Sequence, residues 1–345
     1  MNTLFGTTER INFATAPVDE IFAYYRGEGF PNYQRDDYAP SYELRKVRSA
    51  DEGDYFDGLR FRKYSAANGF LFSYFPHWID VRCGNSPSVA EAWKNDALLL
   101  GLINKTKTYC DKHGENWTEN RFRQNAKVYC AKQSVSNFSP VCARILYDHF
   151  APGGVVYDMS MGWGGRLLGF HASDAKTYIG CEPSTKTYAG LELLNADLSA
   201  ITRKRAVLLN NGSEFADLGK WAGRIDFAFT SPPYFDTEKY SDEPTQSYIA
   251  YPTPAAWLEH FIRPTFAIVY AALRDGGVMA INYADNQMAQ AIREVALAAG
   301  FNHETTLRYE LSSIAGEGRK FEPIFIFRKG IGGRSIETET LFANG

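Results

Sequence analysis

Short apolar runs alternate with longer amphipathic stretches from about Phe138 to Lys329. Seven runs have the length of buried strands: 155–158, 177–182, 206–210, 225–230, 276–282, 305–311 and 323–329. Apolar residues recur at helical spacing over 185–199, 254–273 and 286–299, and Asp285 is positioned to cap the last of these helices. Strands that alternate with helices predict an α/β fold with a mostly parallel sheet. The last two strands have no helix between them, so the final strand is expected to run antiparallel.

The first part of the chain has a different texture. Residues 1–130 contain many Tyr, Asn, Asp and Arg residues and only short apolar runs such as 69–75, with no internal repeat and no low-complexity tract. Their fold does not follow from the pattern. The sequence therefore predicts an accessory region at 1–130, a regular domain at 131–330 and a short tail at 331–345.

In an open α/β sheet, ligands bind at the carboxyl ends of the strands. The first predicted strand ends in Asp158, and the turn after it contains Gly162 and Gly164, where backbone N–H groups can approach a ligand closely. Glu182 follows the second strand, and a carboxylate there can accept hydrogen bonds from both ribose hydroxyls. An acid at this place can also cap the helix that begins beside it. Together, the turn and the acid indicate a cofactor that contains a nucleoside.

The third predicted strand is followed by a polar segment, 210–218. Its Ser213 and Glu214 can face an adenine ring, or they can simply form a turn. The pattern slightly favours the turn.

The fourth predicted strand is followed by Thr-Ser-Pro-Pro-Tyr-Phe. Pro232 and Pro233 each fix their own φ and restrict the residue before them, so the chain makes a stiff corner. The corner presents the Ser231 hydroxyl and the backbone carbonyls as hydrogen-bond acceptors, and Tyr234 offers a flat ring beside them. This arrangement suits a planar substrate that carries an amino group.

Composition and charge narrow the class of protein only slightly. The chain has 345 residues, a net charge of −3 and 15% aromatic residues, which can fill a core or stack on bases. Residues 101–133 carry a local excess of cations, which suits either a phosphate backbone or a solvated helical face. The five cysteines are scattered without metal-ligand spacing, so we expect a reducing compartment, no disulfide framework and no metal site. No signal pattern or membrane-length apolar run occurs, which predicts a cytoplasmic protein.

The glycine turn, the acid and the Ser-Pro-Pro-Tyr corner together resemble the S-adenosylmethionine-dependent amino-methyltransferases of DNA, including those of bacteria and bacteriophages. These enzymes methylate the exocyclic N4 amine of cytosine or N6 amine of adenine. The resemblance covers about 138–329 and implies a Rossmann-like methyltransferase sheet with an antiparallel last strand. It departs from the family at the glycine turn, where the usual Asp-Pro-Phe-x-Gly-x-Gly is Asp-Met-Ser-Met-Gly-Trp-Gly.

The resemblance also implies roles for individual residues. S-adenosylmethionine is the expected cofactor, held by Phe138, Ser139, Asp158, Gly162, Gly164, Glu182, Ser213 and Glu214. The expected catalytic group is Ser231, Pro232, Pro233 and Tyr234, and the serine favours cytosine N4 over adenine N6. Double-stranded DNA with one base flipped out is the expected partner, contacted by Phe235, Tyr240, Lys105, Lys107, Arg121, Arg123 and Lys127, although core packing suits Phe235 better.

Other functions remain open at this stage. N6-adenine methylation of DNA, methylation of RNA, and a non-catalytic nucleic-acid-binding relative each fit part of the pattern. A dinucleotide-dependent enzyme would share the glycine turn and Glu182 but would not explain the Ser-Pro-Pro-Tyr corner. Residues 1–130, together with the loop 236–253, are the natural place for target recognition, as in a restriction–modification methylase.

Overall fold

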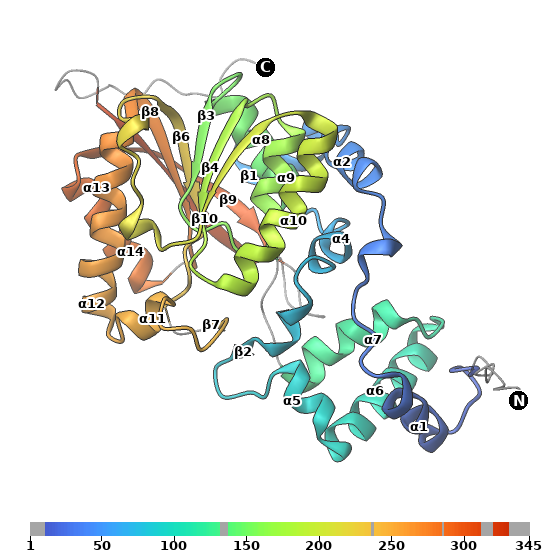
Figure 1. Ribbon diagram of the computed structural model, residues 1–345. Coiled ribbons are helices and arrows are strands. Elements are labelled where there is room, and N and C mark those ends of the chain that lie inside the picture. The colour runs from blue at the N-terminus through green and yellow to red at the C-terminus, as the bar shows by residue number, and fades with distance from the viewer. Residues whose placement is uncertain (1–10, 132–136, 236–237, 285, 312–319, 331–345) are drawn as a thin grey trace, which may run out of the picture. The chain divides into compact units, whose positions relative to one another are not determined.

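The computed structural model describes residues 11–131, 137–235, 238–284, 286–311 and 320–330 (Figure 1). The chain forms two compact units that interleave along the sequence. Unit 1 comprises Met1–Asn32, His77–Val135 and Glu238–Tyr240, and unit 2 comprises Tyr33–Pro76, Ser136–Thr237 and Ser241–Gly345. This division differs from the predicted boundary near residue 130, because residues 33–76 supply a strand and helices to unit 2.

An eight-stranded sheet forms the centre of unit 2, in the order β1-β9-β10-β8-β6-β3-β4-β5. All neighbouring pairs run parallel except those of β10, which is antiparallel to both β8 and β9. Without β1 and β10 this is the doubly wound order 3-2-1-4-5-6. The predicted Rossmann-like sheet with an antiparallel last strand is therefore confirmed. The strands are β1 Arg60–Phe61, β3 Val155–Asp158, β4 Thr177–Cys181, β5 Arg205–Leu209, β6 Ile225–Thr230, β8 Leu273–Asn282, β9 Phe301–Glu310 and β10 Phe321–Lys329.

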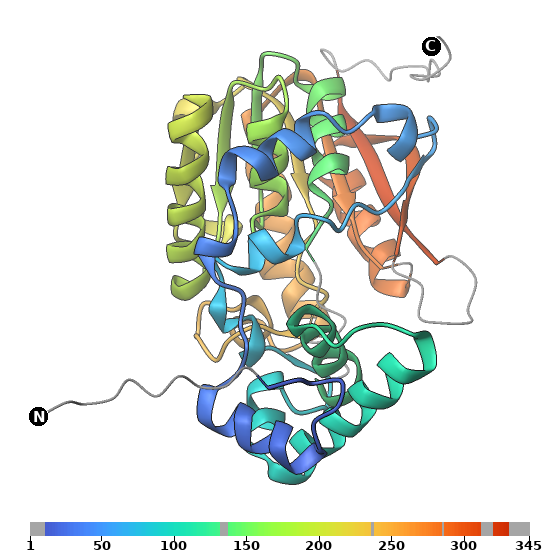
Figure 2. The same ribbon diagram turned by 90° about the vertical axis from the view of Figure 1, so that its right-hand side faces the viewer.

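Helices cover both faces of this sheet. Figures 1 and 2 show α8 (Pro140–Phe150), α9 (Gly165–Ala172) and α10 (Thr185–Thr202) on one face. The other face carries α12 (Pro254–Trp257), the π-helical turn η6 (Leu258–Ile262), α13 (Arg263–Ala272) and α14 (Gln287–Ala298). The smaller helices of unit 2 are α2 (Pro40–Arg48), α3 (Glu52–Tyr55), α4 (Asn68–Phe72) and α11 (Ser247–Ala250), with 3₁₀ turns at Arg35–Asp37, Ser213–Phe215 and Gly219–Trp221.

Two of the predicted helices, 254–273 and 286–299, differ from the observed ones in continuity or in their N-cap. The stretch 254–273 is divided by η6, and Pro264 in the first turn of α13 has no N–H to donate to the preceding turn. Helix α14 is capped by Asn286, whose Oδ1 accepts the Ala289 N–H at 3.1 Å. The predicted cap, Asp285, lies outside the described residues.

Buried apolar side chains fill the space between the sheet and its helices. Trp257, Phe261 and Phe266 pack with side chains of the central strands in one continuous cluster. The strand β6 is buried along almost its whole length, as expected for a central parallel strand that is covered on both faces. No helix in the described part of the chain is both long and apolar enough to cross a lipid bilayer.

Unit 1 is mainly helical, and Figure 2 shows its helices in dark blue and in cyan to green. Tyr25 is 2% exposed and stacks on Phe122 with ring centroids 4.4 Å apart, while Trp117 donates its indole N–H to the Tyr25 hydroxyl. Part of the aromatic surplus of the sequence therefore fills this small core. The elements of unit 1 are α1 Val18–Glu28, η2 Pro76–Asp80, β2 Arg82–Cys83, α5 Val89–Lys94, α6 Asp96–His113, α7 Glu119–Asn125, the π-helical turn η3 Ala126–Ala131 and β7 Glu238–Lys239.

Candidate cofactor and substrate site

The glycine turn joins β3 to α9 at the carboxyl edge of the sheet. Gly162 and Gly164 have φ of +54° and +77°, in the left-handed region that favours glycine. A Cβ on Gly164 would lie 2.5 Å from Leu194 Cδ2, whereas a Cβ on Gly162 would meet nothing nearer than the Ser160 carbonyl at 4.0 Å. The left-handed φ and the close approach of Leu194 therefore both favour glycine at 164, whereas Gly162 leaves open space for a ligand.

Glu182 follows β4 and reaches the same turn. It is 8% exposed, and its Oε2 accepts the Gly162 N–H at 3.0 Å while its Oε1 accepts the Ser184 N–H at 3.0 Å. Burial raises the pKa of this carboxyl to about 7, although the two backbone N–H groups act in the opposite direction. Each oxygen keeps one lone pair, so Glu182 can still accept from the hydroxyls of a ribose.

Asp158 does not face a ligand. It is fully buried at the end of β3, where its Oδ2 accepts from Arg166 Nε at 2.8 Å and from the Tyr178 hydroxyl at 2.7 Å. Its Oδ1 accepts the Ser160 N–H at 3.2 Å. The predicted direct cofactor contact is not compatible with this burial, and the carboxylate instead holds α9 to the sheet.

Residues 137–139 lie against the glycine turn, because Gly165 approaches the Phe138 backbone so closely that a Cβ there would collide with its carbonyl. The Phe138 ring stacks on Tyr309 with centroids 4.8 Å apart. Ser139 is 1% exposed, and its Oγ caps α8 by accepting the Cys142 N–H. The Ser139 hydroxyl therefore serves as a helix cap, and its predicted role in cofactor binding stays a prediction.

Asn137 was not among the predicted site residues. Its side chain is 3% exposed, and neither its Oδ1 nor its Nδ2 has a hydrogen-bond partner in the described structure. Buried amides are normally paired, so an orphaned amide beside the glycine turn is what a missing polar ligand would leave. The segment 137–140 resembles the family's segment that contacts the methionine part of the cofactor, but Asn137 itself was not named among the cofactor-binding residues.

Two residues after β5, Ser213 and Glu214, were predicted to face an adenine, and the structure gives them different surroundings. Ser213 is 1% exposed, with its Oγ 3.0 Å from the Thr265 hydroxyl. Glu214 accepts from the Tyr251 hydroxyl at 3.2 Å through Oε1, while its Oε2 is buried without a partner among the described residues. Burial raises the pKa of Glu214. Ser213 therefore stabilises the turn, and Glu214 retains an acceptor for a ligand.

The proline corner after β6 is held by residues from two other strands. The Ser231 hydroxyl donates to Asn282 Oδ1 at 3.3 Å, and the Tyr234 hydroxyl donates to Glu322 Oε2 at 2.7 Å. The ring of Tyr234 lies 4.7 Å from that of Tyr283. Pro232 is buried, and Ser231, Pro233 and Tyr234 are half-buried. The corner is thus held by side chains of two other strands and remains partly exposed to solvent.

Sequence reasoning missed Asn282 and Glu322. Asn282 ends a predicted strand, so the same rule that found Ser231 would have found it. Glu322 lies near the start of β10, and only the antiparallel direction of this strand brings it to the carboxyl edge of β8.

The residues after Tyr234 have different surroundings. Phe235 adopts a φ of +52°, which is unusual for an aromatic residue, and its ring lies 6.2 Å from Trp257. It packs against the core cluster, which favours the structural role considered for it. Tyr240 belongs to unit 1, next to β7.

Beyond Tyr240 the chain belongs to unit 2 again, and Glu243 binds the first residues of α10. Glu243 accepts from the Ser184 hydroxyl and the Thr185 N–H, each at 3.0 Å. Partial burial opposes its ionisation, but these hydrogen bonds hold the pKa of Glu243 below its ordinary value. Residues 243 and 182 therefore lie at the same helix terminus, and the negative charge of Glu243 adds to the raised pKa of Glu182.

Most of the cations of unit 1 that were predicted to bind phosphate instead contact other residues of that unit. Arg123 is 8% exposed and donates to the Pro31 carbonyl at 2.7 Å, so it cannot reach a phosphate in this conformation. Lys107 donates to the Ala16 carbonyl at 2.6 Å, and Lys127 lies 4.8 Å from the Trp78 ring centroid. Lys105 is exposed beside Tyr129 and remains a candidate for a phosphate contact.

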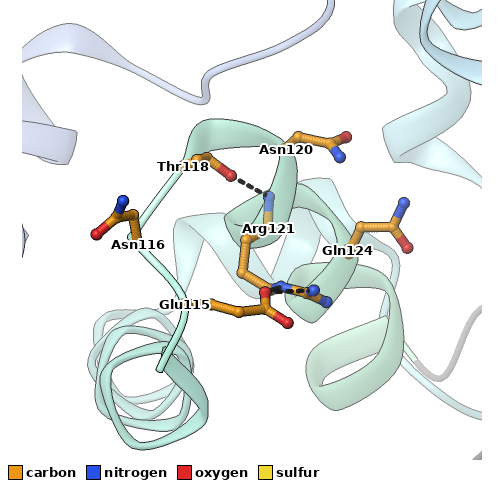
Figure 3. Close-up of a pocket in the computed structure, with 6 residues that line it drawn as sticks. All are labelled: Glu115, Asn116, Thr118, Asn120, Arg121 and Gln124. Atoms are coloured by element: carbon orange, nitrogen blue, oxygen red, sulfur yellow. Dashed lines mark hydrogen bonds and ion pairs between the residues drawn. The ribbon is translucent and has the colours of Figure 1, made fainter. Parts of the chain in front are cut away.

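Arg121 borders a cavity of about 360 Å³ at the start of α7 (Figure 3). Its guanidinium donates to Glu115 Oε2 from Nε at 2.9 Å and from Nη2 at 2.6 Å, as the dashed lines in Figure 3 show. It also lies 4.3 Å from the Tyr109 ring centroid. Its charge is therefore largely neutralised by a protein carboxylate. The cavity is lined by Glu115, Asn116, Thr118, Asn120, Arg121 and Gln124.

Neither a protein-family model nor a curated protein sequence matches the chain. Solved structures with a similar fold include a methyltransferase from Pyrococcus furiosus, with 18% identity over 56% of this chain and 83% of that one, at a TM-score of 0.37. An rRNA methylase from Streptococcus thermophilus shares 15% identity over 57% of this chain and 100% of that one, at a TM-score of 0.38.

A third similar structure was solved with a ligand. The 1,6-didemethyltoxoflavin-N1-methyltransferase of Burkholderia thailandensis, with bound S-adenosylhomocysteine, shares 15% identity over 55% of this chain and 76% of that one, at a TM-score of 0.39. At these identities and TM-scores, the likeness does not extend to a substrate or a reaction.

Proposed function

We propose that this chain is an S-adenosylmethionine-dependent DNA methyltransferase that acts on the exocyclic N4 amine of cytosine. The observation that carries the proposal is the placement of Ser231–Tyr234 directly after β6, which neighbours β3 in the sheet. These two strands flank the point where the strand order reverses, which is where open α/β sheets bind ligands. The glycine turn follows the other strand of this pair.

The residues around the glycine turn fit the proposed cofactor. Glu182 has acceptors for ribose hydroxyls, and Glu214 has a buried acceptor for the amino group of an adenine. The orphaned amide of Asn137 can donate to the carboxylate and accept from the ammonium of a methionine moiety. When bound, S-adenosylmethionine would supply an electrophilic methyl group; the bonding electron pair would stay on the sulfur, and the proton of the methylated nitrogen would pass to solvent.

The proline corner supplies what an aromatic amine needs in order to act as a nucleophile. An amine conjugated to a base ring is a poor nucleophile unless its hydrogens are held by acceptors. Ser231 Oγ and the Pro232 carbonyl are the proposed acceptors, and the ring of Tyr234 is the proposed stacking surface. Most of the catalysis is then positioning, since no covalent enzyme intermediate is required.

A base within a duplex cannot enter such a corner. We propose that the target cytosine is flipped out, which costs a few kcal/mol, and that stacking on Tyr234 recovers about 1–3 kcal/mol of this. Ser231 favours cytosine, and the half-buried position of Tyr234 leaves part of its ring available to the base.

Product analysis tests the proposal directly. Purified protein is incubated with unmethylated duplex DNA and labelled S-adenosylmethionine, and the DNA is digested to nucleosides for mass spectrometry. We expect N4-methylcytosine from the wild type and from the control Ser41→Ala, whose side chain is exposed on α2, and none from Ser231→Ala. N6-methyladenine would overturn the choice of base, and methylated RNA would overturn the choice of DNA. No product on any nucleic acid would overturn the proposed function.

A further inference from the structure

A chain of hydrogen bonds runs from Ser231 across three strands of the sheet. Ser231 Oγ contacts Asn282 Oδ1 at 3.3 Å, and Asn282 Nδ2 contacts Glu322 Oε2 at 3.4 Å and the Pro323 carbonyl at 3.1 Å. Glu322 Oε2 also accepts the Tyr234 hydroxyl at 2.7 Å. Asn282 is 2% exposed, so its amide has no solvent to replace these partners.

The surroundings of Asn282 determine which way its amide points. Glu322 Oε2 and the Pro323 carbonyl are acceptors only, so the NH₂ group must face them and the carbonyl oxygen must face Ser231. The reverse orientation would set the amide oxygen against two other oxygens. With Oδ1 as its neighbour, the Ser231 hydroxyl must donate its proton to Asn282.

This polarity has a chemical consequence for the serine. A hydroxyl whose only proton is committed to Asn282 can offer only lone pairs to anything on its other side. It can accept a hydrogen bond from a substrate amine, and it cannot donate one to a ring nitrogen or a carbonyl. The Ser231 hydroxyl therefore favours a substrate amine, which donates a hydrogen bond, over a ring nitrogen or a carbonyl, which only accepts one.

Glu322 also has an electrostatic neighbour. Lys63, which follows β1, is half-buried and interacts with this carboxylate. Burial lowers the pKa of Lys63, and the negative charge of Glu322 acts in the opposite direction. The lysine therefore sets a positive charge beside the Glu322 carboxylate, which accepts the Tyr234 hydroxyl and the Asn282 amide.

We propose that Asn282 and Glu322 are positioning residues that commit Ser231 to accepting a hydrogen bond from the substrate amine. The proposal rests on the proposed function, because it explains how that site selects and orients an amine. Neither residue is required to touch the substrate: Asn282 acts through Ser231, and Glu322 acts through Asn282 and Tyr234.

Kinetic measurements test the role in the reaction. Glu322→Gln keeps the size of the side chain but brings an NH₂ group that can face the Asn282 NH₂ group, so the amide of Asn282 is no longer held in one orientation. We expect kcat to fall by about tenfold or more, with KM and the cofactor Kd within about twofold of wild type. The control is Glu294→Gln, an exposed acid on α14 of the same unit, which should match wild type. Unchanged kcat in Glu322→Gln would overturn the inference.

A second measurement does not depend on activity. Ser231→Ala and Glu322→Gln are combined in a double-mutant cycle, with the urea midpoint of unfolding as the readout. Because the two residues communicate through Asn282, we expect the two midpoint shifts to be non-additive in the wild-type background and additive in Asn282→Ala. Additive shifts in both backgrounds would overturn the network.

The two measurements separate the possible failures. If the wild type methylates no nucleic acid but the cycle shows coupling through Asn282, the proposed function fails and the hydrogen-bond polarity of Ser231 stands. If the wild type methylates cytosine but the shifts are additive and kcat is unchanged, the function stands and the inference fails.

Discussion

At the scale of single residues, Tyr234 combines two tasks that substitution can separate. Its ring is the proposed stacking surface, and its hydroxyl is held by Glu322 at 2.7 Å. We expect Tyr234→Ala to lower kcat/KM by about 5- to 160-fold, which corresponds to the 1–3 kcal/mol typical of a stacked base. Tyr234→Phe should lose less, because the ring remains. Steady-state kinetics and calorimetry of cofactor binding measure the two effects.

The control for this prediction is the cofactor affinity. Tyr234 does not contact Gly162, Glu182 or Glu214 through any hydrogen bond found in the structure, so the cofactor Kd should stay within about twofold of wild type in both variants. An equal loss of turnover and of cofactor binding in Tyr234→Ala would contradict the stacking role.

Glu182 gives the site a pH dependence near neutrality. Burial raises its pKa from 4.5 to about 7, so the protein without cofactor binds an extra proton here between these values. If the ionised form accepts the ribose hydroxyls, cofactor affinity should rise as the pH rises from 6 to 8. The Kd should change by up to about tenfold per pH unit below 7. Calorimetric titrations across this range measure it.

The same shift has the opposite sign for stability. A raised carboxyl pKa stabilises the folded state below the unfolded pKa, and this contribution is lost as the pH rises through about 7. The free energy of unfolding should therefore fall between pH 5 and 8 while cofactor affinity rises. Glu182→Gln should flatten both profiles, and a pH-dependent affinity that persists in this variant would assign the effect to another group.

At the scale of elements, the two glycines of the turn make a matched pair. Gly164→Ala combines a φ of +77° with a Cβ 2.5 Å from Leu194 Cδ2, whereas Gly162→Ala has a φ of +54° and open space. We expect Gly164→Ala to lose about 3 kcal/mol or more of unfolding free energy and Gly162→Ala about 1–2 kcal/mol. Urea denaturation measures both.

For cofactor binding, we expect the larger effect in Gly162→Ala rather than in Gly164→Ala. The methyl group of Gly162→Ala would occupy the open side of the turn, so its cofactor affinity should fall although the protein remains folded. Equal stability losses in the two variants would show that packing against α10 does not distinguish the glycines.

The elements were predictable to different degrees. The strands 155–158 and 225–230 were predicted with the bounds that β3 and β6 have, because central parallel strands are continuous apolar runs. β9 begins at Phe301, four residues earlier than predicted, because an antiparallel partner tolerates half-exposed residues that break the apolar pattern. The division of the helix at 254–273 by a π-helical turn has no comparable signal in the periodicity.

The residues of the site were also predictable to different degrees. Ser231, Tyr234, Gly162 and Glu182 lie in short motifs, so the sequence alone was enough to propose them. The surroundings of Asp158 could not be foreseen, because its partners Arg166 and Tyr178 take both lone pairs of one oxygen only after the sheet has formed. The long-range partners of the proline corner depend on strand order, which a linear pattern does not contain.

At the scale of the whole molecule, the chain passes between its two units several times. Residues 33–76 belong to unit 2, although they precede most of unit 1. β1 pairs in parallel with β9, joining Arg60 to Arg308 in register. No local pattern predicts a pairing across so long a separation, which is why residues 1–130 were taken as one region.

Unit 2 depends on this early segment for its packing. Phe75 is fully buried, and its ring lies 5.5 Å from that of Trp163 in the glycine turn. A Cβ on Gly190 would lie 2.5 Å from the Phe75 ring, which shows how closely α10 approaches it. Arg144 of α8 donates to the Ala50 carbonyl at 2.7 Å. Arg48 of α2 donates to the His171 carbonyl of α9 at 3.0 Å, so all three helices on this face of the sheet contact residues 33–76.

The consequence is a prediction about truncation. Removing residues 1–130 deletes β1 and Phe75 with unit 1, and should leave an aggregating protein that binds no cofactor, because Trp163 and α10 lose their cover. Removing residues 1–32 and replacing 77–135 with a flexible Gly/Ser linker keeps every element of unit 2. This variant should unfold cooperatively and retain cofactor affinity within about tenfold, while losing DNA binding if unit 1 recognises the target. Circular dichroism, calorimetry and gel shift measure the three properties. If the protein without residues 1–130 folds and binds the cofactor, residues 33–76 are not needed for the stability of unit 2.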